Sequence, residues 1–227
     1  MSGPTLLAVA HGSSHRAAAA TIDALAQQVT RLAPVLDIRL AYVQHAEQSL
    51  ADAVAAAGPD VVIVPLLLST GYHLTTDIAT AVTAAGLAAT RVASPLGPDP
   101  LLVTALAGRL EQAGVPAGTP VVLAAAGSTD PRAAAEVSAQ AESLATELGV
   151  PVVAAFAAAG QPTISTAVAE LRERTGGPVA VATYLLAPGQ FHHRLTESGA
   201  DWVSAPLGDH PAVAALIIDR YRVARTR

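Results

Sequence analysis

The sequence contains no cysteine, and this absence removes several kinds of site. A chain without thiols forms no thiolate zinc site or iron-sulfur cluster and has no cysteine nucleophile, so His, Asp and Glu are the remaining metal ligands. Lysine is absent too, because all thirteen basic residues are arginine; the formal net charge is −5. Since no basic block occurs, we expect no nucleic-acid partner.

Long apolar runs are also absent. Runs such as residues 61–68, which contain a proline, are far shorter than the roughly 18 residues that span a bilayer, so we expect no membrane helix. Residues 1–4 lack the charged and apolar regions of a signal peptide. Together with the lack of cysteine, this favours a cytoplasmic protein.

Apolar, strand-like segments alternate along the chain with alanine-rich helical ones. With 227 residues, 52% of them hydrophobic, the chain is able to bury one large or two small cores. The expected strands are residues 5–10, 35–43, 61–67, 91–94, 120–126, 150–156, 178–185 and 202–205. The expected helices are residues 15–33, 47–57, 75–85, 98–113, 131–148, 162–175, 190–198 and 210–224. This alternation predicts parallel sheets with helices on both faces, although eight units also suffice for a barrel.

An internal repeat favours two sheets over one barrel. AHGSSHRAAAA at residues 10–20 returns as AAGSTDPRAAAE at 125–136. GPDVVIVPLLLSTGYH at 58–73 is matched by GGPVAVATYLLAPGQF at 176–191, and SPLGPDP at 94–100 by APLGDHP at 205–211. Three matches in one order indicate two homologous halves. We therefore predict an α/β protein of two similar lobes, residues 1–115 and 119–227, each a four-stranded parallel sheet flanked by helices, with an interlobe cleft.

The first strand ends at a turn typical of a ligand site. Its apolar run stops at His11-Gly12, where glycine permits a tight turn into the following helix, and Ser13 or Ser14 is expected to cap that helix. His11 therefore lies at the carboxyl end of a strand, where open α/β sheets bind ligands.

The two halves differ where imidazoles occur. His11 is matched by Ala126, and His73 by Phe191, which indicates that the first half holds a functional site and the second only its shape. Strands one and three are commonly neighbours in such sheets, so the two histidines are expected within reach of one ion. Two neutral imidazoles without a third ligand hold a divalent metal loosely, which suits delivery better than storage.

Three motifs carry a resemblance to a known family: AHGS, PLLLSTGYHLTTDI and the repeated PLG. In these motifs the chain resembles the class II chelatases, the sirohydrochlorin ferrochelatase and cobaltochelatase family, in their duplicated two-lobed form. The resemblance covers essentially the whole chain and implies a chelatase-like fold. It implies that His11 and His73 bind the metal, and that Co²⁺ or Fe²⁺ is inserted into a sirohydrochlorin-type tetrapyrrole without ATP, for siroheme or cobalamin biosynthesis. No cofactor beyond this substrate metal is implied, and both metals remain candidates because both accept imidazole.

The proton acceptor departs from the family pattern. Many members carry a glutamate after the second strand, where this chain has Gln44, and an amide does not act as a base. His45 is our first candidate for the role. Glu47, the metal histidines and the substrate carboxylates are the alternatives.

Because such a tetrapyrrole carries many carboxylates, the acidic chain must present local donors and positive groups to it. The candidates are Ser13, Arg16, Arg39, His192, His193 and Arg194, with Tyr72 as part of an apolar floor for the ring. The alternative for each histidine is structural: a strand-end histidine taken alone is more often a hydrogen-bonded surface residue, and His192-His193 also fits a solvated helix start.

Two other classes of function stay open. One is a non-catalytic carrier of metal or tetrapyrrole, which Gln44 favours. The other is a small-molecule binding module or hydrolase that uses the Gly12-Ser13 and Gly127-Ser128 turns, although neither is the strained elbow of a serine nucleophile. Since the duplication replaces a second subunit, we expect a monomer.

Overall fold

The computed structural model describes residues 4–46, 48–70, 72–87 and 90–226, with the side chains of residues 72–75 excepted. In this part of the chain eight strands alternate with eight helices, as the sequence predicts. The first sheet contains β1 (Thr5–Ala10), β2 (Ile38–Tyr42), β3 (Val61–Pro65) and β4 (Arg91–Val92). The second contains β5 (Val121–Gly127), β6 (Val152–Ala159), β7 (Ala180–Tyr184) and β8 (Trp202–Val203).

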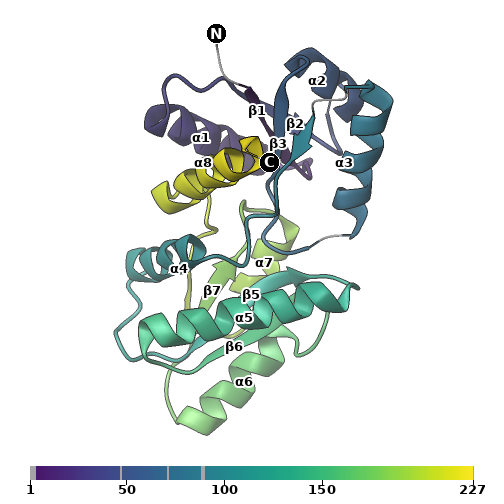
Figure 1. Cartoon of the computed structure of the whole chain (residues 1–227). Helices are drawn as coiled ribbons and strands as arrows, with labels where there is room; N and C mark the ends of the chain where they lie inside the picture. The colour runs from purple at the N-terminus through teal and green to yellow at the C-terminus, as the bar shows by residue number, and fades with distance from the viewer. Residues whose placement is uncertain (1–3, 47, 71, 88–89, 227) are drawn as a thin grey trace. The chain divides into compact units, whose positions relative to one another are not determined.

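The strand order confirms two separate sheets and excludes the barrel. The orders are β2-β1-β3-β4 and β6-β5-β7-β8, and every pair is parallel, so the repeat in sequence is a repeat in topology. Both sheets lie between helices (Figure 1). The predicted fold class is thereby confirmed, whereas the interlobe cleft stays a prediction.

Four helices come from each half of the sequence. The first half contributes α1 (Arg16–Leu32), α2 (Leu50–Ala57), α3 (Tyr72–Ala85) and α4 (Pro100–Gln112). The second contributes α5 (Pro131–Leu148), α6 (Ile164–Thr175), α7 (Gln190–Thr196) and α8 (Pro211–Arg225). The expected serine cap of α1 is wrong: His15 occupies the N-cap position without a side-chain cap, and the Ser13 hydroxyl accepts from the His15 amide at 3.1 Å.

The compact units are not the two sequence halves. Unit 1 comprises Met1–Leu96 and Asp209–Arg227, and unit 2 comprises Gly97–Gly208. The expected division at residues 115–119 therefore separates the repeats but not the units. The reason is an exchange of the fourth helices: α4 packs on α5 and β7 of unit 2, and α8 packs on α1, β3 and β4 of unit 1.

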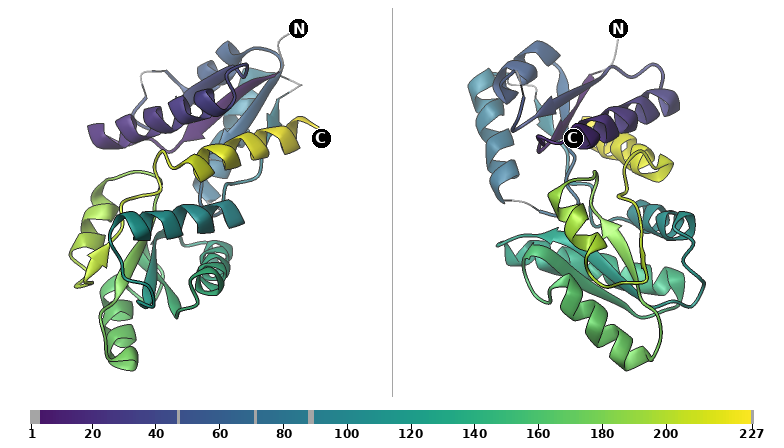
Figure 2. Two further views of the ribbon diagram at one scale, coloured as in Figure 1. Left: turned by 90° about the vertical axis from the view of Figure 1, so that its left-hand side faces the viewer. Right: turned by 180° about the vertical axis from the view of Figure 1, so that it is seen from behind.

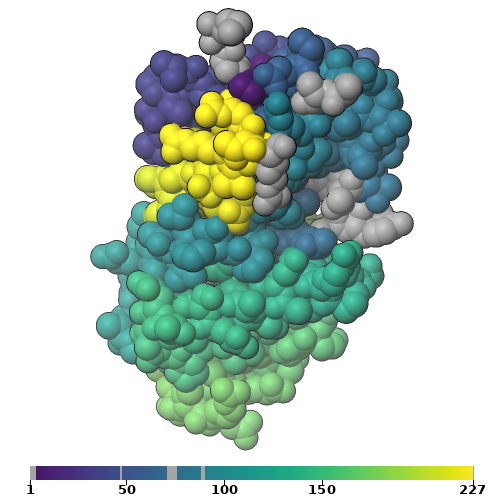
Figure 3. Space-filling view, viewed as in Figure 1, coloured from purple at the N-terminus to yellow at the C-terminus, as the bar shows by residue number. Residues whose placement is uncertain are grey.

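In unit 1 the sheet is covered on both faces. α1 and α8 lie side by side on one face, and α2 and α3 cover the other (Figures 1 and 2). All six residues of β1 are buried, as expected of a central strand. The space-filling view shows the yellow atoms of α8 against the purple atoms of α1 (Figure 3). The side of α8 that faces the unit buries Ala212, Val213, Ala214, Leu216, Ile217, Ile218, Tyr221 and Ala224.

Unit 2 has the same layered construction. α4 and α5 pack together (Figure 2). α6 and α7 contact the sheet through Ile164, Leu171 and Leu195. Two fully buried hydroxyls each bond the backbone of the other residue: the Thr183 hydroxyl donates to the Ser204 carbonyl at 2.6 Å, and the Ser204 hydroxyl accepts from the Thr183 amide at 3.0 Å. None of the helices in the described part of the chain has the length and hydropathy that crossing a bilayer requires.

Candidate functional site

The carboxyl ends of three strands meet at one edge of the unit 1 sheet, here called the site edge. β1 pairs with β2 on one side, Ala10 opposite Tyr42, and with β3 on the other, Val9 opposite Pro65. His11 follows β1, and α3 begins at Tyr72 after β3. The prediction that strands one and three are neighbours is confirmed, and the same edge also receives the segment after β2.

Gly12 brings the turn after β1 into direct contact with that segment. The His11 carbonyl accepts from the Gln44 amide at 2.9 Å. Gly12 has a φ of +92°, and a Cβ at this position would lie 2.0 Å from the Gln44 carbonyl oxygen. Only glycine therefore permits this approach, which places His11 beside the segment that contains Gln44 and His45.

Unit 2 repeats the same contact without the imidazoles. Gly127 also has a φ of +92°, and its Cβ would lie 1.9 Å from the Ala159 carbonyl oxygen. Gly127 pairs with Ala159 in the sheet, so Ala159 is the counterpart of Gln44 and Gly160 that of His45. The glycine contact thus belongs to the shared fold, whereas the polar side chains belong to unit 1.

His45 adopts a backbone conformation that favours glycine. Its φ of 55° is the one positive φ outside glycine among the described residues, and its counterpart Gly160 has a φ of +123°. The imidazole is exposed. A side chain kept in the left-handed region costs on the order of 1 kcal/mol or more, which points to a use for this imidazole.

The metal ligands predicted from sequence are placed in part. The His11 side chain is exposed at the site edge. The backbone of His73 lies in the first turn of α3, at the same edge, but its side chain is outside the described residues, as are the side chain of Tyr72 and all of Glu47. In the described ranges no three His, Asp or Glu side chains form a group able to hold a metal.

The predicted substrate-binding residues of unit 1 fall at two ends of the sheet. Ser13 and Arg16 are exposed at the start of α1, close to His11 in sequence. Arg39 is not brought to the site edge, because it lies near the amino end of β2, opposite Leu7. Its guanidinium donates to the Ala56 carbonyl at 2.7 Å and to Asp37 at 3.1 Å.

In unit 2, His192 and His193 differ in their surroundings. His192 is partly buried, and burial lowers the pKa of its imidazole; a hydrogen bond with the Ser204 backbone acts in the opposite direction. His193 is exposed and lies 3.5 Å from the Glu197 carboxylate one helical turn away. His192 therefore lies against the backbone of Ser204, just after β8, while His193 faces solvent.

Arg194 is engaged within unit 2. Its guanidinium donates to the Ala157 carbonyl at 3.0 Å and lies over the Phe191 ring, 5.9 Å from the ring centroid. Phe191 is 39% exposed. The residue that replaces His73 in the repeat is thus an aromatic platform for a cation.

Tyr42 was not among the residues predicted from the sequence, and the register places it beside Ala10 at the end of β1. Burial, with a smaller contribution from the Asp23 carboxylate, raises the pKa of its hydroxyl above the ordinary value, so the hydroxyl keeps its proton. Its place near the end of the strand expected at residues 35–43 was the signal in the sequence.

Comparison with known proteins supplies the family. A family model described as CbiX matches residues 5–113 and again residues 120–224. The chain belongs to the CbiX family. The two matches coincide with the two repeats, and the resemblance to the class II chelatases is thereby confirmed.

Solved structures similar to this CbiX-family chain extend over nearly its whole length. SirB from Bacillus subtilis with Fe³⁺ has 25% sequence identity and a TM-score of 0.83, covering 98% of this chain and 96% of SirB. CbiX, described as the terminal enzyme for biosynthesis of siroheme in denitrifying bacteria, has 27% identity and a TM-score of 0.74, covering 97% and 99%. SirB from Bacillus subtilis subspecies spizizenii, in complex with cobalt, shares the fold at 21% identity, with a TM-score of 0.80 and coverage of 99% and 96%. No curated protein matches the sequence.

Proposed function

We propose that this CbiX-family chain inserts a divalent metal ion, Co²⁺ or Fe²⁺, into a sirohydrochlorin-type tetrapyrrole without ATP, as a step of siroheme or cobalamin biosynthesis. The proposal rests on the family match to both repeats. It is supported by the fold shared with SirB and CbiX, and by the meeting of the segments that bear His11, His45 and His73 at one sheet edge.

In this proposal the metal is a substrate, and His11 and His73 are its ligands. An imidazole replaces bound water and so lowers the cost of dehydrating the ion. Two neutral imidazoles bind a divalent ion less tightly than the four ring nitrogens of a tetrapyrrole. The ion is therefore transferred from the weaker to the stronger ligand set, with no need for ATP.

Insertion also releases two protons from the pyrrole nitrogens, and a base near the metal must accept them. We assign this role to His45, because its side chain is exposed at the site edge. Gln44 is exposed beside it but is an amide, and so does not accept a proton. The unfavourable φ of His45, at a position where unit 2 has glycine, supports a functional reason for this imidazole.

The tetrapyrrole is proposed to bind through its carboxylates and its ring face. Ser13, Arg16, His192, His193 and Arg194 are the proposed partners of the carboxylates, and Tyr72 of the ring. Arg39 is withdrawn, since its guanidinium contacts α2 near the other end of its strand. We further propose that the chain acts as a cytoplasmic monomer.

The test is an anaerobic measurement of sirohydrochlorin absorbance with Co²⁺ and, separately, Fe²⁺, with and without the chain and in the absence of ATP. We expect many equivalents of metallated product per chain, formed faster than in the protein-free solution. The carrier alternative, which Gln44 favours, predicts at most one equivalent per chain. A spectrum that the chain leaves unchanged contradicts both functions.

A further inference from the structure

Two arginines occupy the same position in the two exchanged helices. Arg109 on α4 and Arg220 on α8 are equally distant from the prolines, Pro100 and Pro211, that begin these helices. Each helix follows a copy of the repeated PLG motif, here called the PLG segments, residues 95–97 and 206–208. Because α4 and α8 are exchanged, each arginine meets the PLG segment of the other repeat.

The contacts are made in corresponding ways within each unit. In unit 1 the Arg220 guanidinium donates from Nε to the Pro95 carbonyl and from Nη2 to the Leu96 carbonyl, both at 2.8 Å. In unit 2 Arg109 donates from Nε and Nη2 to the Leu207 carbonyl, at 3.2 and 2.8 Å. A planar guanidinium suits such paired donation, which a single ammonium does not reproduce.

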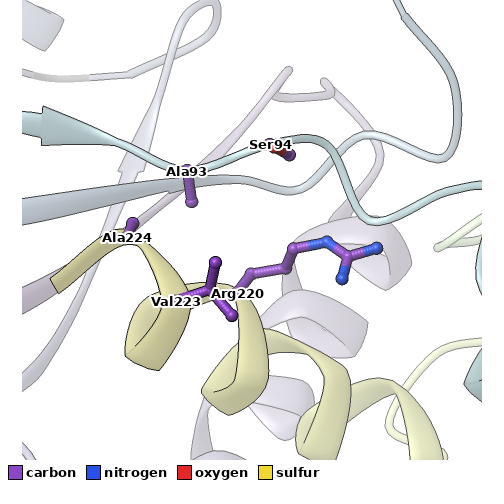
Figure 4. A pocket seen from close by; sticks show the side chains of 5 residues that line it. All are labelled: Ala93, Ser94, Arg220, Val223 and Ala224. Atoms are coloured by element: carbon purple, nitrogen blue, oxygen red, sulfur yellow. The ribbon is translucent and has the colours of Figure 1, made fainter. Parts of the chain in front are cut away.

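The Arg220 side chain is only 17% exposed. Figure 4 shows it extending from α8 along the segment that leaves β4, close to Ala93 and Ser94. A small pocket beside it is lined by Ala93, Ser94, Arg220, Val223 and Ala224. The Arg220 side chain runs beneath residues 93–94, and its guanidinium reaches the PLG segment at residues 95–97.

The PLG segments in turn contact the loops that follow the third strands. The Leu96 amide donates to the Leu67 carbonyl at 2.7 Å, and the Leu207 amide donates to the Leu185 carbonyl at 2.8 Å. Leu96 and Leu207 are fully buried, so both segments are anchored. In unit 1 the contacted loop leads to α3 and His73.

In unit 2 the corresponding loop leads to α7, where Phe191 stands in the place of His73. The chain thus contains two copies of one support. Only the copy in unit 1 has a histidine at this position.

We propose that Arg220 is a positioning residue for the metal site, acting through Leu96 and Leu67 on the connection between β3 and α3. This rests on the proposed function, in which His73 binds the metal. Arg220 itself contacts neither metal nor tetrapyrrole in this proposal. Arg220 holds the backbone that leads to His73. Loss of the Arg220 side chain therefore weakens metal binding by more than the accompanying loss of folding stability explains.

The experiment compares Arg220→Ala and Arg220→Lys with two matched controls. Arg109→Ala removes the same support from unit 2, and Tyr221→Phe removes another α8 contact of unit 1, the 2.6 Å hydrogen bond to the Pro4 carbonyl near the amino end of β1. The readouts are the melting temperature and the dissociation constant for Co²⁺, titrated by its visible absorption without tetrapyrrole.

We expect Arg220→Ala to weaken Co²⁺ binding about tenfold or more, as loss of residues that orient metal ligands does, and Arg220→Lys to weaken it less. Arg109→Ala and Tyr221→Phe are expected to lower the melting temperature by about 2–8 °C and to keep the native Co²⁺ affinity. Should Arg220→Ala fail to fold, Arg220→Lys decides the same comparison.

Two further outcomes separate the inference from the function on which it rests. Weak Co²⁺ binding in His73→Ala together with native affinity in both Arg220 variants overturns the inference and leaves the proposed function intact. Equal Co²⁺ affinity in the native chain and in His73→Ala overturns the proposed function, and the inference with it.

Discussion

Gly12 places the turn after β1 against the segment after β2, and this contact shapes the site edge. Its φ is +92°, and the Gln44 carbonyl occupies the space that a Cβ would need. A substitution there combines backbone strain with a collision against backbone atoms, which do not move aside as a side-chain end does. Gly127 has the same geometry, but in unit 2 the residues that correspond to His11 and His45 are Ala126 and Gly160.

Gly12→Ala is expected to lower the free energy of unfolding by about 2–5 kcal/mol, and Gly127→Ala by a similar amount. Gly58→Ala is the control for strain alone, because Gly58 has a φ of +98° with nothing within 4 Å of the added Cβ; about 1–2 kcal/mol is expected. Urea unfolding measures all three. Equal losses in Gly12→Ala and Gly58→Ala would show that the contact with Gln44 is not tight.

His45 allows the backbone cost and the chemistry to be separated. His45→Gly should keep the free energy of unfolding within about 1 kcal/mol of the native value, since relief of strain offsets the greater freedom of the unfolded chain. His45→Val should lower it by about 1–3 kcal/mol, because a β-branched residue tolerates a φ of 55° poorly. If His45 accepts the pyrrole protons, both variants lose about 100-fold in insertion rate. A native rate in His45→Gly would transfer the role to another group.

His192 gives unit 2 a dependence on pH with a defined sign. Burial lowers the pKa of its imidazole in the folded state, so the unfolded chain takes up the proton first as pH falls. The free energy of unfolding should therefore be undiminished above about pH 6.5 and decrease as pH falls from there through the lowered folded pKa. His192→Gln should flatten this part of the curve, measured by urea unfolding between about pH 7 and 5. An unchanged slope would mean that other groups produce it.

At the scale of elements, the exchange of α4 and α8 is the feature that sequence patterns do not reveal. Both helices were predicted from their periodicity, as residues 98–113 and 210–224, and both formed at these places. Each buries several aliphatic side chains, Leu102 and Leu106 in one and Leu216 and Ile217 in the other. The two sheets have the same strand order and offer similar surfaces to these helices. The periodicity of a helix therefore indicates that one of its faces is buried, but not which sheet buries it.

Deletion of residues 209–227 tests the exchange. α8 buries Val213, Leu216 and Ile217 almost completely, and each such side chain contributes roughly 1.5–3 kcal/mol, which is large against a typical stability of about 5–15 kcal/mol. The deletion should therefore unfold unit 1 and leave unit 2 folded. Hydrogen exchange should show lost protection in β1 and β3 and retained protection in β5 and β7. The reverse pattern would restore the division at residues 115–119.

At the scale of the whole molecule, the duplication could be recognised in the sequence because three pairs of segments recur in the same order. The two strand orders that result are the same, and the apolar run of residues 5–10 formed β1 over its full length. The position of Arg39 was less predictable. The expected strand began at residue 35, whereas β2 begins at Ile38, so Arg39 moved from mid-strand to the amino end. Charge alone does not show at which end of a strand a guanidinium finds its partners.

Of the candidate site, the sequence predicted only which strands are neighbours and which half of the chain carries the histidines. The apolar replacements of His11 and His73 in the second half indicated unit 1, and the pairing of β1 with β3 brings the segments that bear these two histidines to one edge of the sheet. The contacts of Arg109 and Arg220 could not be predicted, because they form only when each fourth helix packs on the sheet of the other repeat. The left-handed backbone of His45 is likewise a property of the folded turn.

The most direct test of the account is the initial rate of Co²⁺ and Fe²⁺ insertion into sirohydrochlorin under anaerobic conditions, for the native chain, His11→Ala and His73→Ala. His15→Ala is the control, because His15 is exposed at the start of α1 and forms no side-chain cap. The account predicts rates near the spontaneous one for His11→Ala and His73→Ala, and native rates for His15→Ala. Native rates in His11→Ala and His73→Ala would contradict it, since the metal would then be delivered by residues other than the two histidines.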